Sequence, residues 1–125
     1  MGDLTKNFSR HEFACHCGCG SADVEKKLVE HLQELRDLIG QPVIVVSGCR
    51  CNAHNTAVGG ATHSQHLFGC AADVRVKGIT PVEIKHLAET IDAFCYGGIG
   101  LYDTFTHLDV RTTGFARWNG ETHVT

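Results

Sequence analysis

In the stretch Ser64–Val76, SQHLFGCAADVRV, of the 125-residue chain, a histidine and an aspartate stand seven positions apart and a strand-like run follows. Its second half is apolar and favours a strand, and Gly69 allows the chain to bend just before it. Because side chains alternate along a strand, Asp73 lies on one face of the sheet and its neighbours on the other. His66 is in the preceding loop, which can fold back and bring its imidazole beside Asp73.

A second stretch, Phe105–Arg111 (FTHLDVR), offers another imidazole in a strand-like pattern. The same alternation places His107 and Asp109 on one face and the adjacent apolar residues on the other, toward the core. Two imidazoles and one carboxylate are a common ligand set for catalytic zinc, with a fourth position left for water. Spacing alone leaves a second interpretation open, in which His66, Asp73 and His107 are ordinary loop and strand residues.

Helices are predicted in three places. Apolar residues recur at helical spacing through Ala22–Ile39, and Gly40 ends that pattern. Thr80–Ala93 opens with an N-cap threonine, a proline at the first helical position and a glutamate in the first turn, which together predict a second helix. Ser9 followed by Glu12 forms a capping-box pattern, which predicts a short helix near the start of the chain.

Strands are predicted mainly in the second half of the chain, after the first long helix. In addition to the two stretches above, β-branched or glycine-bounded apolar runs predict strands over residues 42–48, 97–102 and 115–118. Early helices followed by clustered strands indicate an α+β fold, with a small, mostly antiparallel sheet and helices packed against it. The length fits a single domain over residues 1–125.

Charge and hydropathy exclude several classes of partner. The formal net charge is −3, so a nucleic-acid partner has no electrostatic support. No apolar run is long enough to cross a bilayer, so no membrane partner is expected. The N-terminal residues lack the pattern of a secretory signal, and we therefore expect a protein that is synthesised in the cytoplasm without a signal peptide. We also expect it to be a monomer.

Taken together, the motifs closely resemble those of the zinc D-Ala-D-Ala carboxypeptidase family, the M15 peptidases of bacterial and phage cell-wall enzymes. The family pattern is S-x-H-x-x-G-x-A-x-D, with S-G-x-R upstream and H-x-D near the C-terminal end. The resemblance extends from about Phe8 to Arg111, nearly the whole chain. The matching residues are Ser64, His66, Gly69, Ala71 and Asp73, then His107 and Asp109, and upstream Ser47, Gly48 and Arg50.

This resemblance implies a Hedgehog/DD-peptidase-like fold and a zinc-dependent metallopeptidase. The implied substrate is the stem peptide of peptidoglycan, cut either at its D-Ala-D-Ala end by a carboxypeptidase or at an internal bond by an L,D-endopeptidase. One catalytic zinc is implied, which would activate the attacking water. By the same resemblance, the zinc ligands are His66, Asp73 and His107.

The resemblance also implies the residues that would contact substrate. Arg50 matches a family arginine that holds the substrate or the tetrahedral oxyanion, and a guanidinium can grip two oxygens at once. Ser64 and Gln65 belong to the same motif and are expected to line the substrate cleft.

The general base is left open between two aspartates. In several branches of the family a carboxylate lies three residues before the last histidine, where this chain has Thr104. Asp103 is one position away from that place. Asp109 follows His107 by two residues and shares its strand face, so it is the favoured candidate, with Asp103 as the second. Asp109 could instead orient a zinc ligand.

The cysteines suggest a second site. The chain has seven, an odd number that excludes complete internal disulfide pairing. Two C-x-C pairs could assemble a structural zinc site or, outside the cell, a disulfide; reduced, partly buried thiols are the third alternative. The first pair comes from Cys15, Cys17 and Cys19, and the second is Cys49 and Cys51, which flank Arg50. The candidate residues for the site are Cys15, Cys17, Cys19 and Cys51.

A different functional class is compatible with the same motifs. The Hedgehog signalling domain resembles this family in its zinc-ligand pattern yet acts as a ligand, so a non-catalytic zinc-containing binding module, such as a phage structural component, is the alternative. Thr104 at the usual position of the base favours it. For the peptidase, action on the cell wall and a phage or prophage origin are expected.

Overall fold

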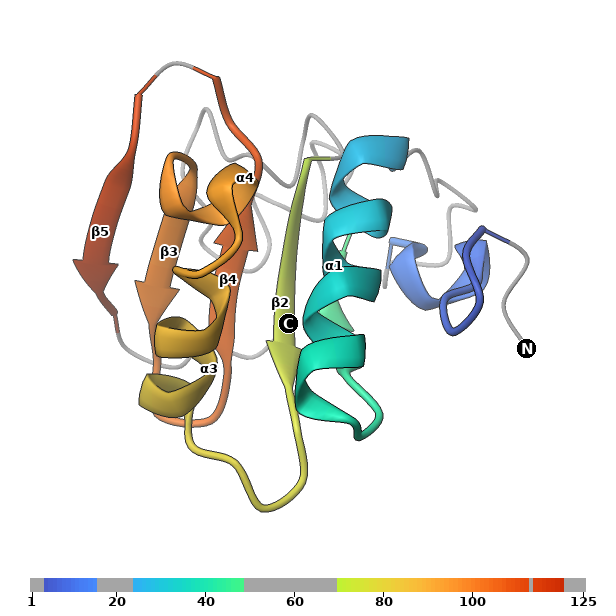
Figure 1. The fold of residues 1–125 in the computed structure, drawn as a ribbon, viewed down its shortest axis with the longest axis horizontal. Coiled ribbons are helices and arrows are strands. Elements are labelled where there is room, and N and C mark those ends of the chain that lie inside the picture. The colour runs from blue at the N-terminus through green and yellow to red at the C-terminus, as the bar shows by residue number, and fades with distance from the viewer. Residues whose placement is uncertain (1–3, 16–23, 49–69, 113, 121–125) are drawn as a thin grey trace.

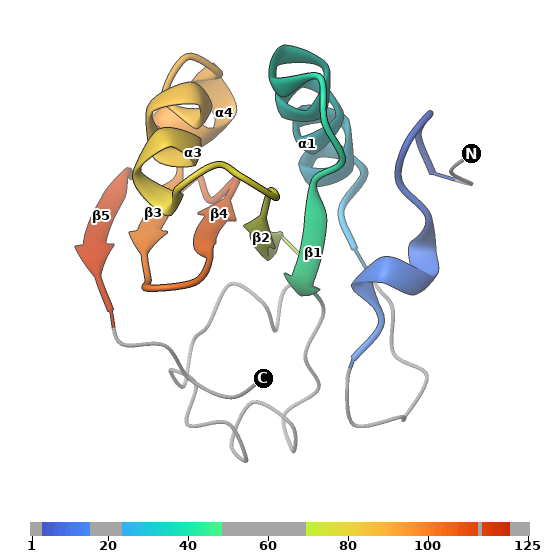
Figure 2. The ribbon, with the colours of Figure 1, turned by 90° about the horizontal axis from the view of Figure 1, so that it is seen from below.

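A computed structural model describes residues 4–15, 24–48, 70–112 and 114–120. Within these ranges five strands form one sheet in the order β1-β2-β4-β3-β5, and every neighbouring pair is antiparallel except β3 and β5. Helices α1, α3 and α4 lie on the same side of this sheet (Figures 1 and 2). The predicted α+β class with a mostly antiparallel sheet is confirmed. The elements are η1 Arg10–Phe13, α1 Lys26–Ile39, β1 Ile44–Ser47, β2 Ala71–Arg75, α3 Pro81–Ala88, α4 Asp92–Cys95, β3 Gly98–Leu101, β4 Thr106–Asp109 and β5 Ala116–Asn119.

Helix α1 ends where its sequence pattern ends. Gly40 adopts a left-handed conformation with φ of 74°, and its N–H bonds to the carbonyl of Arg36 at 2.9 Å, which caps the helix. The inner face of the helix buries Leu28, Leu32 and Leu35 completely against the sheet. The described helix starts at Lys26, and the predicted start at Ala22 lies outside the described residues.

The second predicted helix is interrupted. Its N-terminus is as expected, because the hydroxyl of Thr80 accepts a hydrogen bond from the Glu83 N–H at 3.2 Å. The helix stops at Ala88 instead of continuing to Ala93, and a separate turn, α4, resumes at Asp92. The hydroxyl of Thr90 donates to the carbonyl of Leu87 at 2.6 Å, so a side chain takes an acceptor near the helix end.

The short helix η1 packs beside β1 at one edge of the sheet (Figure 2). Its capping box is formed as predicted, with the Ser9 N–H donating to Glu12 Oε2 at 2.6 Å. Phe13 is fully buried and lies so close to Gly48 that a β-carbon there would come within 2.7 Å of its Cα. None of the described helices has the length and apolar character needed to cross a membrane.

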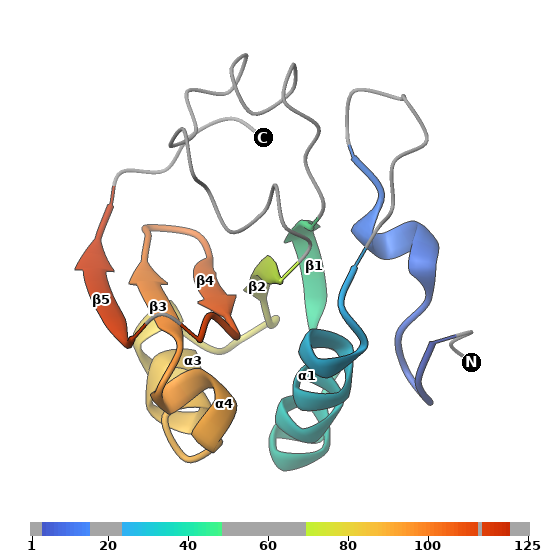
Figure 3. The same ribbon diagram turned by 90° about the horizontal axis from the view of Figure 1, so that it is seen from above.

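The hydrophobic core fills the space between the sheet and the helices. Ala72, Val74, Ile99 and Leu108 supply the sheet side of this core. The residues that alternate with them therefore lie on the opposite face, away from the helices seen in Figure 3. That second face carries the polar groups of the candidate site, on β2 and β4.

Candidate metal centre

Asp73 and His107 meet across two neighbouring strands. The antiparallel register of β2 and β4 pairs them directly, and Nδ1 of His107 lies 3.0 Å from Oδ1 of Asp73. Both are nearly inaccessible, with 2% of Asp73 and 6% of His107 exposed. Buried polar groups of this kind are usually fixed by defined partners. The structure therefore brings together two of the three predicted zinc ligands.

Asp109 holds the other side of the same imidazole. Its Oδ2 lies 2.8 Å from Nε2 of His107, and no part of the residue is exposed. The backbone N–H of Gly98, on the neighbouring strand β3, donates to Oδ1 at 2.8 Å. With the hydrogen of the neutral ring on Nε2, shared with Asp109, Nδ1 is the nitrogen that His107 would offer to a metal, and it is the nitrogen that faces Asp73.

Arg111 grips both oxygens of Asp109. Its Nε donates to Oδ1 at 2.8 Å, and a terminal nitrogen donates to Oδ2 at 2.7 Å. The Arg111 backbone N–H adds a third contact to Oδ1 at 3.2 Å. This two-point arrangement is the strongest geometry available to an arginine and a carboxylate, and it fixes the plane of the carboxylate.

Trp118 closes one side of the imidazole. The centres of the Trp118 and His107 rings are 4.9 Å apart, with the ring planes inclined by 52°. Gly100 pairs with His107 on one side and with Trp118 on the other, and its missing side chain leaves the room that the indole occupies. The indole N–H donates to the Tyr102 hydroxyl at 3.1 Å, which anchors the ring.

The ionisation of this cluster follows from its contacts. Burial opposes a charged imidazole, but the hydrogen bonds and charges of Asp109 and Asp73 outweigh burial and raise the pKa of His107 above its usual value. Burial would also raise the pKa of Asp109, yet Arg111 and His107 hold it well below the usual range. Asp109 is therefore a permanent anion at neutral pH.

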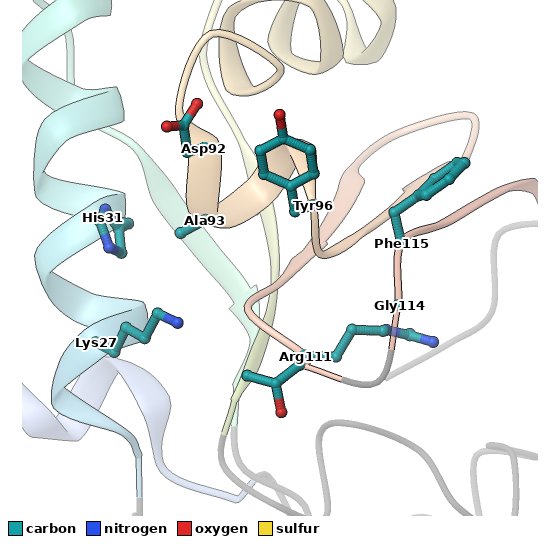
Figure 4. A pocket seen from close by; sticks show the side chains of 9 residues that line it. Lys27, His31, Asp92, Ala93, Tyr96, Arg111, Gly114 and Phe115 are labelled. Atoms are coloured by element: carbon teal, nitrogen blue, oxygen red, sulfur yellow. The ribbon is translucent and has the colours of Figure 1, made fainter.

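Arg111 extends from a separate pocket into this cluster. Its stem lines a pocket of about 660 Å³ between α1, α4 and the segment after β4. In Figure 4 its guanidinium end points away from the α1 side chains that border the same pocket. The charged head is thus committed to Asp109, while the stem packs among the lining residues, which include Lys27, His31, Asp92, Tyr96 and Phe115.

Two further predicted site residues lie in the described part of the chain. Asp103 is exposed in the turn between β3 and β4, and Cys15 is buried. Within the described ranges, no group of three or more histidine, cysteine, aspartate or glutamate side chains is arranged to hold a metal. The remaining predicted residues lie outside the described ranges: Cys17, Cys19, Arg50, Cys51, Ser64, Gln65 and His66.

Sequence reasoning missed Arg111 and Trp118 as parts of the site. Arg111 follows Asp109 by two residues, so continuing the strand alternation by one step would have included it. Trp118 had no local signal, because its position depends on the parallel pairing of β5 with β3.

The donor atoms of Asp73 and His107 fit zinc. A carboxylate oxygen and an imidazole nitrogen are both zinc ligands, and two ligands of one tetrahedral ion lie about 3.4 Å apart at zinc distances of about 2.0–2.2 Å. The observed separation of 3.0 Å is close to that spacing. The orientation of His107 by Asp109 also matches the hydrogen bonding usual for a metal-bound histidine.

The α+β domain places a carboxylate and an imidazole side by side on one sheet face, and both are donor types that bind zinc. The family model described as Peptidase M15 matches residues 6–109, most of the chain, and the protein therefore belongs to the peptidase M15 family. Membership implies a metallopeptidase of a generally zinc-dependent family with a peptide-type substrate. A comparison with curated proteins found none that matches.

The glycine beside Asp109 provides a first prediction. A β-carbon on Gly98 would lie 2.3 Å from Asp109 Oδ2, so Gly98→Ala should push the carboxylate out of place. We expect a loss of about 1–3 kcal/mol in the free energy of unfolding, as for overpacking of a filled site, together with weaker zinc binding. Chemical denaturation and a zinc titration measure the two effects. Unchanged stability and zinc affinity would contradict the observed packing.

Proposed function

We propose that the protein is a zinc-dependent peptidase that hydrolyses peptidoglycan stem peptides, as a D-Ala-D-Ala carboxypeptidase or an L,D-endopeptidase. The observation that carries this proposal is the buried Asp73–His107 pair, with its imidazole oriented by Asp109, in a chain of the M15 family. We further propose one peptidase domain over residues 1–125, acting as a monomer on the cell wall and of phage or prophage origin. The proposed zinc ligands are His66, Asp73 and His107.

Asp73 and His107 would hold the metal on the sheet face away from the helices. Zinc, when bound, lowers the pKa of a water ligand to about 7 and polarises the substrate carbonyl. His107 must present an unprotonated Nδ1 for this purpose. In the neutral ring, Asp109 favours the tautomer that carries its hydrogen on Nε2, so that Nδ1 is the nitrogen that would face the metal. Asp73 contributes a negative charge that offsets part of the charge of the cation.

Asp109 is better suited to orient His107 than to act as the general base. Both of its oxygens already accept hydrogen bonds, from His107, Arg111 and the Gly98 N–H. A general base works best when its pKa lies near the working pH, and the pKa of Asp109 is held well below its usual range. These contacts support the orienting role over the favoured assignment from sequence.

Asp103 then becomes the leading candidate for the base. It is exposed in the β3–β4 turn, which leads directly into the strand that carries His107. If it has this role, Asp103→Asn should lower kcat by about 10²–10⁴-fold with zinc content unchanged. Asp92→Asn, another exposed aspartate, on α4, is the matched control and should leave kcat unaltered. An unchanged kcat in Asp103→Asn would assign the base to another residue.

The other predicted residues complete the proposal. Arg50 would bind the substrate carboxylate or the developing oxyanion, and Ser64 and Gln65 would line the cleft. For the cysteines we retain the two proposed arrangements, a second, structural zinc or a disulfide, formed among Cys15, Cys17, Cys19 and Cys51. The burial of Cys15 is compatible with both.

Digestion of purified muropeptides by the zinc-loaded protein tests the proposed function. Mass spectrometry should show either loss of a terminal D-alanine or cleavage of an internal L,D bond, and the mass change identifies which. The same reaction with His107→Ala is the control and should yield no product. Intact muropeptides after incubation with fully zinc-loaded protein would contradict the peptidase proposal.

Intact muropeptides would favour the alternative, a non-catalytic zinc-containing module such as a phage structural component. Two observations support that alternative: Thr104 occupies the usual position of the base, and the carboxylate of Asp109 is committed to Arg111 and His107.

A further inference from the structure

We infer that Arg111 is a positioning residue of the proposed zinc site and acts through Asp109, with Trp118 holding both Arg111 and His107 in place. This inference rests on the proposed function, because it concerns the residues that would bind the metal. It assigns a role to two side chains that neither bind zinc in the proposal nor contact substrate.

The position of the Asp109 carboxylate depends on Arg111. Oδ2 is shared between Nε2 of His107 and a terminal nitrogen of Arg111, and Oδ1 is shared between Nε of Arg111 and the Gly98 N–H. The planar fork of the guanidinium prevents the carboxylate from rotating. A carboxylate that cannot rotate keeps its hydrogen bond to Nε2, and so keeps Nδ1 of His107 directed at Asp73.

Arg111 also balances charge at this place. Asp109 is completely buried, and a buried carboxylate needs compensating charge and hydrogen bonds. With both oxygens occupied, Asp109 is held as a partner of His107 and kept from binding the metal itself. By occupying the oxygens of Asp109, Arg111 leaves Asp73 as the aspartate that would bind the metal.

Trp118 supports this arrangement from the side of β5. The Cζ atom of Arg111 lies 5.5 Å from the centre of the indole, a distance at which a cation and an aromatic face attract each other. The same indole packs against the His107 ring and is anchored through its N–H to Tyr102. One rigid side chain therefore limits the movement of both the guanidinium and the imidazole.

Zinc affinity of Arg111→Lys provides the test. Lysine keeps the charge but loses the planar fork, so we expect the zinc dissociation constant to rise by about 10–100-fold, as for other partners of metal ligands. Competition with a chelator measures the constant, and the visible absorption of the cobalt-substituted protein should change because the ligand geometry changes. Both readouts are independent of peptidase activity.

Arg117→Lys is the matched control. Arg117 is as buried as Arg111, with side-chain exposures of 22% and 21%, but it bonds to Glu89 and to backbone carbonyls of Cys95 and Gly97. It should bind zinc and cobalt like the wild type. Trp118→Phe is a second variant, which keeps a ring but loses the bond to Tyr102, and it should weaken zinc binding several-fold.

A double variant tests whether Arg111 acts through Asp109. If it does, adding Arg111→Lys to Asp109→Asn should weaken zinc binding little further, because Asp109→Asn has already removed the carboxylate through which Arg111 acts. Fully additive effects, or wild-type affinity in both Arg111→Lys and Trp118→Phe, would overturn the inference while leaving the proposed function intact. Failure of the wild type to bind zinc would overturn both.

Discussion

Replacing His107 by alanine should remove one tightly bound zinc ion per chain and reduce muropeptide hydrolysis to background. The imidazole supplies a proposed ligand atom, Nδ1, at the point where β4 faces Asp73 on β2. A three-ligand site that loses one ligand keeps too few donors to retain the ion. Metal content after extensive dialysis, measured by mass spectrometry, checks the first expectation.

His86→Ala is the control for this experiment. His86 is an exposed histidine on α3, on the helical side of the sheet, and its removal should change neither metal content nor turnover. If the cysteines hold a second zinc, the content of His107→Ala should fall from two ions to one. Full zinc occupancy in His107→Ala would show that this histidine is not a ligand.

Loss of the Asp109 carboxylate should have the second-largest effect. Asp109→Asn should weaken zinc binding by about 10–100-fold, because the amide lacks the negative charge and has only one acceptor oxygen for His107 and Arg111 to share. Excess zinc should restore turnover. Asp109→Ala should additionally lower the free energy of unfolding by about 3–5 kcal/mol, since the half-buried Arg111 and buried His107 lose their shared partner.

The two proposed roles of Asp109 give different results in the asparagine variant. If Asp109 is the general base, Asp109→Asn should lower kcat by about 10²–10⁴-fold, and excess zinc should not restore kcat. Asp73→Asn provides the comparison, because losing a ligand should release zinc more completely than losing the group that orients one. A persistent loss of kcat in zinc-saturated Asp109→Asn would return Asp109 to the role of base.

Local patterns were sufficient for much of the fold. The apolar spacing of α1 and its terminal Gly40 predicted that helix, and strand alternation placed Asp73 and His107 correctly on faces away from the core. The break between α3 and α4 was not predicted. The proline at the first helical position and the apolar spacing after it predicted one continuous helix, and neither pattern indicates that the Thr90 hydroxyl bonds to the carbonyl of Leu87.

The site was less predictable where it depends on contacts between distant residues. Strand adjacency suggested Asp109 as the base, but the groups that occupy its oxygens come partly from β3, through the Gly98 N–H. Trp118 reaches His107 only because β5 pairs in parallel with β3 beside Gly100. His66 and Arg50 lie outside the described residues, so their roles remain predictions.

Anomalous diffraction at the zinc absorption edge, from crystals of the zinc-loaded protein, tests the central claim most directly. We expect one strong peak bonded to Nδ1 of His107 and to the carboxylate of Asp73, with His66 as the third protein ligand and Asp109 bonded to Nε2 of His107. A peak bonded to Nε2 of His107, or the absence of any peak bonded to Asp73 and His107, would contradict the account.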